Sequence, residues 1–312
     1  MFSNFTAANY ENLLIYNFCA FALQMPLGAL LDLLAIEKRC CGSRFALLGV
    51  MLTILGAQLN PALLGFGNAL FHVGGGFDVI HEDLRHRRKG RNLGIFVAPG
   101  AIGLYVGTLL GNQSFGKSAL IASVIMIVPF LFMLIKQGRA IQNYNHSVSS
   151  ARIPLILLGC CFAVVILRSW VGLAVSFPWK GNGILAAIAV CGAAAGKVCG
   201  GYLGARFGIQ RTAAVTLVLA AVSFLLGNIP LLGIFALFFF NMTMPLTLYL
   251  LAEKMPKLAG FSFGLLTFGL FLGFLPVYFE SGPTFSGSVL GAFGSVLTLL
   301  LLTIAGKVGK DG

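Results

Sequence analysis

Long apolar runs, each about the length of a membrane-spanning helix, alternate with short polar segments along the chain. A spanning helix needs about 20 mostly apolar residues, and only helices or closed barrels satisfy the backbone in lipid. Pro61 and Pro230 divide the two longest runs, because the residue before a proline resists the helical conformation. The pattern predicts eleven spanning helices, at 12–36, 44–60, 61–80, 93–110, 118–135, 154–177, 183–203, 212–228, 230–252, 261–279 and 288–305.

The composition supports an all-α, polytopic integral membrane protein. Apolar residues make up 58% of the 312 residues and charged residues only 10%, with a mean hydropathy of +0.93. A soluble domain carries roughly 25% charged residues, so this chain cannot cover a water-facing surface. The net charge of +12 does not indicate nucleic acid, because the basic residues are scattered between the apolar runs. The lipid bilayer is the expected surrounding.

The basic residues predict the orientation, because loops on the cytoplasmic side carry an excess of Lys and Arg. With the N-terminus outside and the C-terminus in the cytoplasm, the inner loops and tail hold Lys38, Arg39, Arg44, Arg85, Arg87, Arg88, Lys89, Arg91, Lys136, Arg139, Arg152, Arg206, Arg211, Lys254, Lys257, Lys307 and Lys310. The outer loops hold only Lys117 and Lys180. We therefore expect a multi-pass protein of the cell (plasma or inner) membrane.

Two segments that each leave a predicted span for a basic inner loop resemble one another. Residues 28–38 read GALLDLLAIEK, and residues 201–211 read GYLGARFGIQR. Ala205 stands where the first segment has Asp32. Two related segments at matching topological positions indicate an internal repeat.

Both segments resemble the loop motif of the major facilitator superfamily, roughly G-x-L-x-D-R-x-G-R-R, which follows the second helix of each six-helix half. The positions that match are Gly28, Leu30 and Asp32 in the first copy, and Gly201, Leu203, Arg206, Gly208 and Arg211 in the second. The resemblance implies a five-helix bundle at 1–135, a cytoplasmic linker at 136–153 and a six-helix bundle at 154–312. It also implies that a substrate binds between the bundles and moves by rocking of one against the other.

The repeat predicts that the first helix of the family is absent. The span at 154–177 precedes the second motif copy, and no span precedes the first copy. A start codon farther upstream and an eleven-helix variant both fit this pattern. A second copy of the chain, in a homo-oligomer, is a candidate to fill the gap.

Two further segments carry the resemblance. Residues 65–76 look like the fourth helix of drug-resistance-type facilitators, and members similar to the fosmidomycin-resistance transporters often carry the Phe-His pair seen here at Phe71 and His72. Residues 94–111 resemble the glycine-rich fifth helix. Antiporters carry a Gly-Pro pair there, whereas this chain has Pro99-Gly100, so antiport stays open.

Three ionisable residues lie well inside predicted spans, where charge is costly and usually marks a pathway. His72, near the midplane, is either a proton site or substrate contact, or a neutral imidazole bonded to a neighbouring helix. Arg168 either recognises an anionic or polar substrate, or takes part in an ion pair or carbonyl cage. Lys197, one turn before Gly201, has a stem long enough to reach the inner interface, which favours a structural role.

Uncharged polar residues are candidates to line the same pathway. They are Asn17, Gln24, Asn68, Tyr105, Asn241, Thr243 and Thr267. Each also fits an interhelical hydrogen bond. Asn68 and His72 are four residues apart, so they share one face of their helix, which strengthens the case for both.

The carboxylates are predicted to lie outside the middle of the membrane. Asp32, Asp78 and Glu253 sit at inner ends of spans, and most others fall in loops or tails. Proton coupling would therefore depend on His72 or on a group in the absent helix. The family resemblance implies a gating role for Asp32, which steadies the inner closure near the start of the eleventh helix, here around Phe261. Gly28, Gly201 and Arg206 belong to the same predicted gating region.

No pattern of residues indicates an enzyme, a cofactor or a metal site. The seven cysteines lack paired metal-ligand spacing, and no nucleophile stands with a base in the spans. We therefore predict a secondary transporter for a small polar or anionic molecule, with H⁺ as a candidate coupling ion. The alternative is a non-transporting membrane receptor or a remnant of a transporter.

Overall fold

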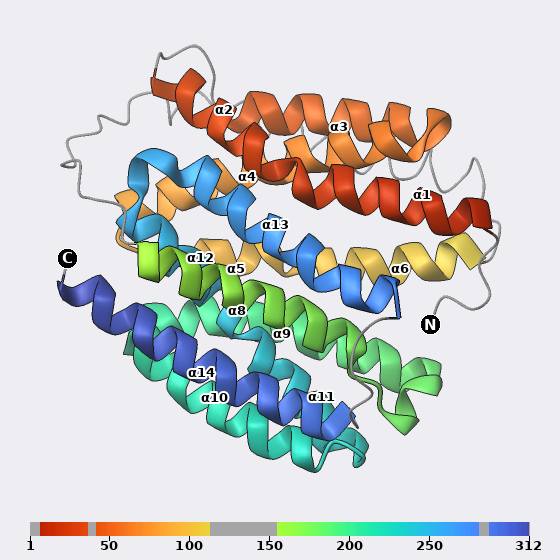
Figure 1. Cartoon of the computed structure of the whole chain (residues 1–312), viewed down its shortest axis with the longest axis vertical. Helices are drawn as coiled ribbons and strands as arrows, with labels where there is room; N and C mark the ends of the chain where they lie inside the picture. Colours follow the sequence, from red (N-terminus) through yellow and green to blue (C-terminus); the bar gives the residue numbers. More distant parts are fainter. Residues whose placement is uncertain (1–6, 37–41, 113–154, 281–286, 312) are drawn as a thin grey trace. The chain divides into compact units, whose positions relative to one another are not determined.

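The structure, a computed structural model, describes residues 7–36, 42–112, 155–280 and 287–311, and these residues are almost entirely helical (Figure 1). Within them, 9 helices are long and apolar enough to cross a membrane. This agrees with the predicted all-α, polytopic fold. The predicted span at 118–135 and the linker at 136–153 lie outside the described residues.

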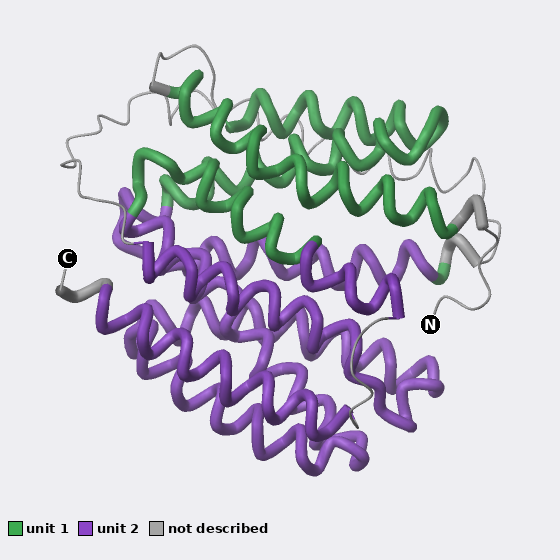
Figure 2. The backbone as a smooth tube through the Cα atoms, in the orientation of Figure 1, with its two compact units in different colours: residues 1–82, 109–149, 255–271 green, residues 83–108, 150–254, 272–312 purple. Residues whose placement is uncertain are grey.

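The chain divides into two compact units that do not follow the order of the sequence (Figure 2). Unit 1 comprises residues 1–82, 109–149 and 255–271, and unit 2 comprises residues 83–108, 150–254 and 272–312. Each unit therefore contains a segment from the opposite half of the chain. The predicted bundles, 1–135 and 154–312, describe the repeat and remain a prediction.

Unit 1 is built on helices that approach closely at small residues. Its elements are α1 (Ala7–Asn17), η1 (Phe18–Ala22), α2 (Gln24–Ile36), α3 (Gly42–Leu59), most of α4 (Pro61–Arg85), η3 (Pro256–Leu258) and the first part of α13 (Ala259–Tyr278). The π-helical turn η1 joins α1 and α2 into one long span. On α3, Gly49 lies against the backbone of Phe71 on α4 without room for a side chain, as is common where helices pack in lipid.

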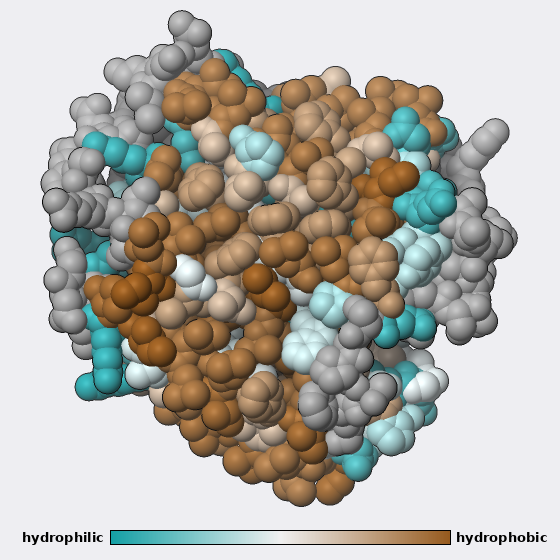
Figure 3. All heavy atoms as spheres, viewed as in Figure 1, coloured by the Kyte–Doolittle hydropathy of each residue, from teal (hydrophilic) through white to brown (hydrophobic). Residues whose placement is uncertain are grey.

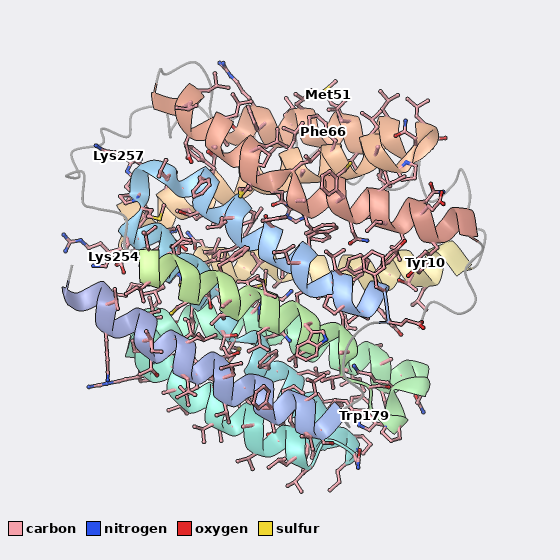
Figure 4. All side chains as sticks on the ribbon, in the orientation of Figure 1. Tyr10, Met51, Phe66, Trp179, Lys254 and Lys257 are labelled. Atoms are coloured by element: carbon pink, nitrogen blue, oxygen red, sulfur yellow. The ribbon has the colours of Figure 1, made fainter. Side chains whose placement is uncertain are left out.

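Unit 2 contains most of the second half of the chain. Its elements are α5 (Arg91–Val97), most of α6 (Pro99–Asn112), α8 (Leu155–Ala174), η2 (Pro178–Gly181), α9 (Gly183–Phe207), α10 (Ile209–Leu225), α11 (Pro230–Asn241), α12 (Thr243–Lys254), the end of α13, and α14 (Gly287–Asp311). Helix α14 packs against α8 and α10, and α9 packs against α5, α11 and α12. Figure 4 shows Trp179 and Lys254 at opposite ends of this unit.

Prolines interrupt two of the predicted spans. The span predicted at 93–110 breaks at Ala98 into α5 and α6, and the span predicted at 230–252 breaks at Met242 into α11 and α12. Pro99 and Pro245 follow these breaks, and each removes a backbone N–H from the helical ladder. The helix predicted at 212–228 runs instead from Ile209 to Leu225.

The outer faces of the helices are apolar. Large hydrophobic side chains with more than half of their surface exposed include Leu33, Met51 and Leu59 in unit 1, and Leu155, Ile184 and Val215 in unit 2. In Figure 3, apolar residues cover most of the helices on the viewed face, and hydrophilic residues gather mainly near helix ends. Such a surface matches lipid, and the chain is a multi-pass membrane protein.

Candidate functional site

In unit 1, the start of α13 crosses α2 at a pair of glycines. A Cβ on Gly28 would collide with the backbone of Gly260 and Phe261, and a Cβ on Gly264 would collide with the carbonyl of Gln24. The two helices therefore touch through their backbones. Any side chain larger than hydrogen at Gly28 would force them apart.

The Asp32 carboxylate joins the same two helices. Its Oδ1 accepts the N–H of Gly260 at 2.8 Å, and its Oδ2 accepts the N–H of Phe261 at 2.7 Å. These are N–H groups at the start of α13, which have no partner within their own helix and favour negative charge. Asp32 is 2% exposed. The contact lies where the sequence predicted a gating contact, around Phe261, and the gating role itself remains a prediction.

In unit 2, α9 also meets the start of α5 at glycines. A Cβ on Gly201 would lie 2.6 Å from the carbonyl oxygen of Gly90, and a Cβ on Gly94 would lie 2.6 Å from that of Lys197. Gly90 itself has a φ of 86°, which favours glycine. The second motif copy thus forms the counterpart of the α2·α13 crossing, with Ala205 in the place of Asp32.

A different carboxylate caps α5. Asp83, near the end of α4, accepts the N–H of Asn92 at 3.2 Å and the N–H of Leu93 at 3.0 Å, and it is fully buried. The hydropathy pattern does not reveal this group, because the span that it predicts ends at residue 80, whereas α4 continues to Arg85. The sequence does contain one signal for this role: Asp83 stands only a few residues before α5, close enough in sequence for its carboxylate to cap that helix.

Arg206, the fourth predicted gating residue, lies at the end of α9. It is exposed, and its guanidinium carbon lies 5.4 Å from the ring centroid of Phe207. This is a local cation–π contact on one helix. Neither this contact nor any other tests its predicted gating role.

Arg168 lies on the buried stripe of α8. That stripe follows helical spacing and consists of Leu157, Cys161, Val164, Val165, Arg168 and Val171. Only 7% of Arg168 is exposed, and its Nε has no hydrogen-bond partner among the described residues. The ion pair and the carbonyl cage considered for Arg168 are therefore not found in the described part of the chain.

Lys197 on α9 points toward the break between α5 and α6. Its Nζ donates to the carbonyl of Val97 at 3.4 Å. That carbonyl is available because the N–H of Ala101 bonds instead to Ala98, at 3.3 Å. Lys197 is half-buried and interacts electrostatically with Arg168. The structure therefore gives Lys197 a carbonyl partner inside unit 2, and its predicted reach to the inner interface of the membrane stays a prediction.

His72 and Asn68 lie on α4, as the predicted span implied, and both are half-buried. The His72 ring lies 5.3 Å from that of Phe71, edge to face, and the imidazole makes a further interaction. His81 lies just beyond the predicted span at 61–80 but belongs to α4: it is 3% exposed, and its Nδ1 lies 2.8 Å from the carbonyl of Phe77.

Most uncharged candidates bond to a backbone carbonyl close by in the sequence. Side chains that donate to a carbonyl three or four residues earlier are Asn17 (to Leu13), Gln24 (to Ala20), Asn241 (to Leu237), Thr243 (to Phe240) and Thr267 (to Gly264). Tyr105 instead donates to the carbonyl of Gly183 at 3.0 Å, which joins α6 to α9. Gln24 retains a buried Oε1 without a partner among the described residues.

In the part of the chain that the structure describes, no three His, Cys, Asp or Glu side chains come together to hold a metal ion. The cysteines described there are free thiols. The charged or ionisable side chains described inside the spans of unit 2 include the buried Arg168 and the half-buried Lys197, and α4 carries the imidazoles of His72 and His81.

No family model and no curated protein matches the sequence. Solved structures do. A variant of the E. coli fucose:proton symporter FucP matches with a TM-score of 0.61 and 15% identity over 96% of this chain and 90% of that one. FucP in its outward conformation, described as a major facilitator superfamily transporter, gives 0.61 and 14% over 98% and 91%. A bacterial homologue of the iron transporter ferroportin, facing outward, gives 0.59 and 15% over 98% and 89%. The chain therefore has the fold of the major facilitator superfamily transporters.

Proposed function

We propose that this chain is a secondary transporter that moves a small polar or anionic molecule across the membrane by alternating access, with H⁺ as the candidate coupling ion. The observation that carries this proposal is Arg168. A guanidinium buried in the middle of a spanning helix is costly, and such residues mark substrate or ion pathways. The fold shared with a fucose:proton symporter supports the same function.

The two glycine crossings support movement by alternating access. At Gly28 and at Gly201, helices meet through backbone rather than through interlocked side chains. Because no side chains interlock at these glycines, one helix can slide against the other without a change of side-chain packing there, as shear motions between packed helices require. Proton coupling would rest on His72, since an imidazole changes its charge near physiological pH.

The test is flux into proteoliposomes under an imposed pH gradient, with a panel of organic anions, sugars and drug-like cations. Wild type is compared with Arg168→Ala and His72→Ala, and with His86→Ala and Lys307→Ala as controls, because both control side chains are exposed. We expect Arg168→Ala to abolish flux and His72→Ala to remove its dependence on the pH gradient, with both controls active.

The alternative function is a non-transporting membrane receptor or a remnant. It predicts that no compound of the panel is transported in the same liposomes, even where a compound binds. A cooperative thermal unfolding transition would show that the protein used is folded. Flux that survives both Arg168→Ala and His72→Ala would keep the transporter and overturn the assignment of these residues.

A further inference from the structure

Two cations of unit 2, the buried Arg168 and the half-buried Lys197, lack anionic partners among the described residues. The buried Nε of Arg168 has no hydrogen-bond partner among the described residues. Neither Arg168 nor Lys197 forms an ion pair with a described acidic side chain. The chain has only 9 acidic residues, and the segment 113–154, which lies outside the described residues, contains none of them. Two carboxylates of unit 2 accept hydrogen bonds from other groups: Asp83 caps α5, and Glu253 accepts from Tyr249 at 3.3 Å.

The two cations belong to helices that meet around one element. Helices α5, α8 and α9 each pack against α12. Arg168 comes from the buried stripe of α8, and Lys197 comes from α9, with its Nζ held by Val97 at the end of α5. The two positive charges repel each other in this arrangement. Like charges that interact in a medium of low dielectric constant destabilise one another unless an anion joins them.

The bond that holds Lys197 is weak enough to be exchanged. At 3.4 Å, it lies beyond the usual range of 2.7–3.2 Å for an N–H···O hydrogen bond. An ammonium carries three donors, and this is the one hydrogen bond that it makes to the described residues. Lys197 can therefore donate to a ligand without first losing a strong partner.

We propose that Arg168 and Lys197 form a two-cation site for a compact oxyanion, a carboxylate or phosphate group of the transported molecule, an inference that rests on the proposed function. The guanidinium fork matches two oxygens of such a group, and the ammonium of Lys197 serves as a point charge for a further oxygen or a second carboxylate. The favoured substrates are phosphate esters and dicarboxylates, and neutral sugars are disfavoured.

Substitution of Arg168 separates a binding role from a structural one, because the two roles predict opposite changes in stability. An unpaired buried charge destabilises the empty protein, so Arg168→Met should raise the Tm of the unliganded chain by a few degrees. A guanidinium that holds the fold together would give a lower Tm instead. Lys307→Met, which removes one exposed charge from the end of α14, should leave the Tm unchanged.

The same variants test the ligand. The full chain in a neutral detergent is unfolded by heating with inorganic phosphate, succinate or neutral succinamide at constant ionic strength. We expect phosphate or succinate to raise the wild-type Tm in a dose-dependent manner, and succinamide to have no effect. Arg168→Met should abolish this response and Lys197→Met should weaken the apparent affinity about tenfold, whereas Lys307→Met keeps it.

Each outcome decides between the possibilities. No response to either anion, together with a lower Tm of Arg168→Met, overturns the site. A response to phosphatidylglycerol micelles but not to the soluble anions also overturns it, because the oxyanion would then be a lipid headgroup. Anion binding without flux in liposomes supports the site and refutes the transport function. Flux of neutral compounds, without anion binding, keeps the transporter and overturns the site.

Discussion

The α2·α13 crossing of unit 1 and the α9·α5 crossing of unit 2 are built alike but held differently. In both, a motif glycine, Gly28 or Gly201, brings two backbones together. In unit 1 the acid that caps the second helix, Asp32, lies on the crossing helix itself, 228 residues from its partner Gly260. In unit 2 the corresponding position is Ala205, and the cap on α5 comes from Asp83, only 9 residues before Asn92.

The difference concerns which motion each carboxylate opposes. Asp32 must lose two hydrogen bonds if α2 and α13 separate, whereas Asp83 moves with α5 and keeps both bonds when α9 moves away. The contacts described at the α9·α5 crossing are backbone packing at Gly201 and the long bond from Lys197. We infer that the two related crossings open at different cost, the one in unit 2 more readily.

The largest expected effect comes from filling the tighter crossing. Gly28→Ala places a Cβ against backbone atoms of Gly260 and Phe261, which cannot rotate away, so we expect a loss of about 1–3 kcal/mol in stability and loss of flux. Gly201→Ala meets its nearest atom at 2.6 Å and should cost less. Thermal unfolding and liposome flux measure both, and Gly103→Ala, which meets nothing within 4 Å, is the control. A larger loss in Gly201→Ala would reverse the ranking of the crossings.

The next effect separates the two caps. Asp32→Ala leaves two N–H groups at the start of α13 without an acceptor, and Asp83→Ala does the same to α5, each at about 1–3 kcal/mol. Only Asp32 joins the two crossing helices, so only Asp32→Ala should also change the accessibility of cysteines placed along α2. Alkylation rates and Tm values provide the readouts. Equal changes in alkylation for the two variants would contradict the distinction.

A smaller effect is expected if the missing acid is restored. Ala205→Asp places a carboxylate on α9 one turn after Gly201, whose Cβ would meet the backbone of Gly90 and Arg91 at the start of α5. A favourable interaction with the helix terminus is worth about 0.3–1 kcal/mol. We expect a slightly higher Tm and slower flux, since the second crossing then resembles the first. Ala205→Asn is the uncharged control, and faster flux in Ala205→Asp would refute the role of the acid.

The smallest effect is expected at Arg206. Its guanidinium is exposed and lies over the ring of Phe207 on the same helix, so Arg206→Ala should cost about 0.5–1 kcal/mol at most. Flux should change less than in Ala205→Asp. A loss of flux as large as that of Gly28→Ala would indicate that Arg206 acts in gating, as its place in the motif predicted.

The spans and the α2·α13 crossing could be predicted because lipid and the motif constrain them directly. Apolar length defines a spanning helix, and Asp32 stands at the end of one such run. Asp83 and His81 could not be found in this way, because the apolar run ends near residue 80 whereas the helix α4 continues to Arg85. The lack of a partner for the Arg168 Nε among the described residues could not be predicted either, because a partner can come from any helix of the fold.

The exchange of segments between the units has a consequence for biogenesis. Unit 1 contains residues 255–271, and unit 2 contains residues 83–108. A nascent chain that has inserted only its first half therefore holds Asp32 without the donors of Gly260 and Phe261, and Gly90 without Gly201. The contact between α2 and α13 can form only after α13 has been synthesised and inserted. Insertion and folding are consequently separate stages for this protein, and a chain truncated in the linker should be a target of membrane quality control.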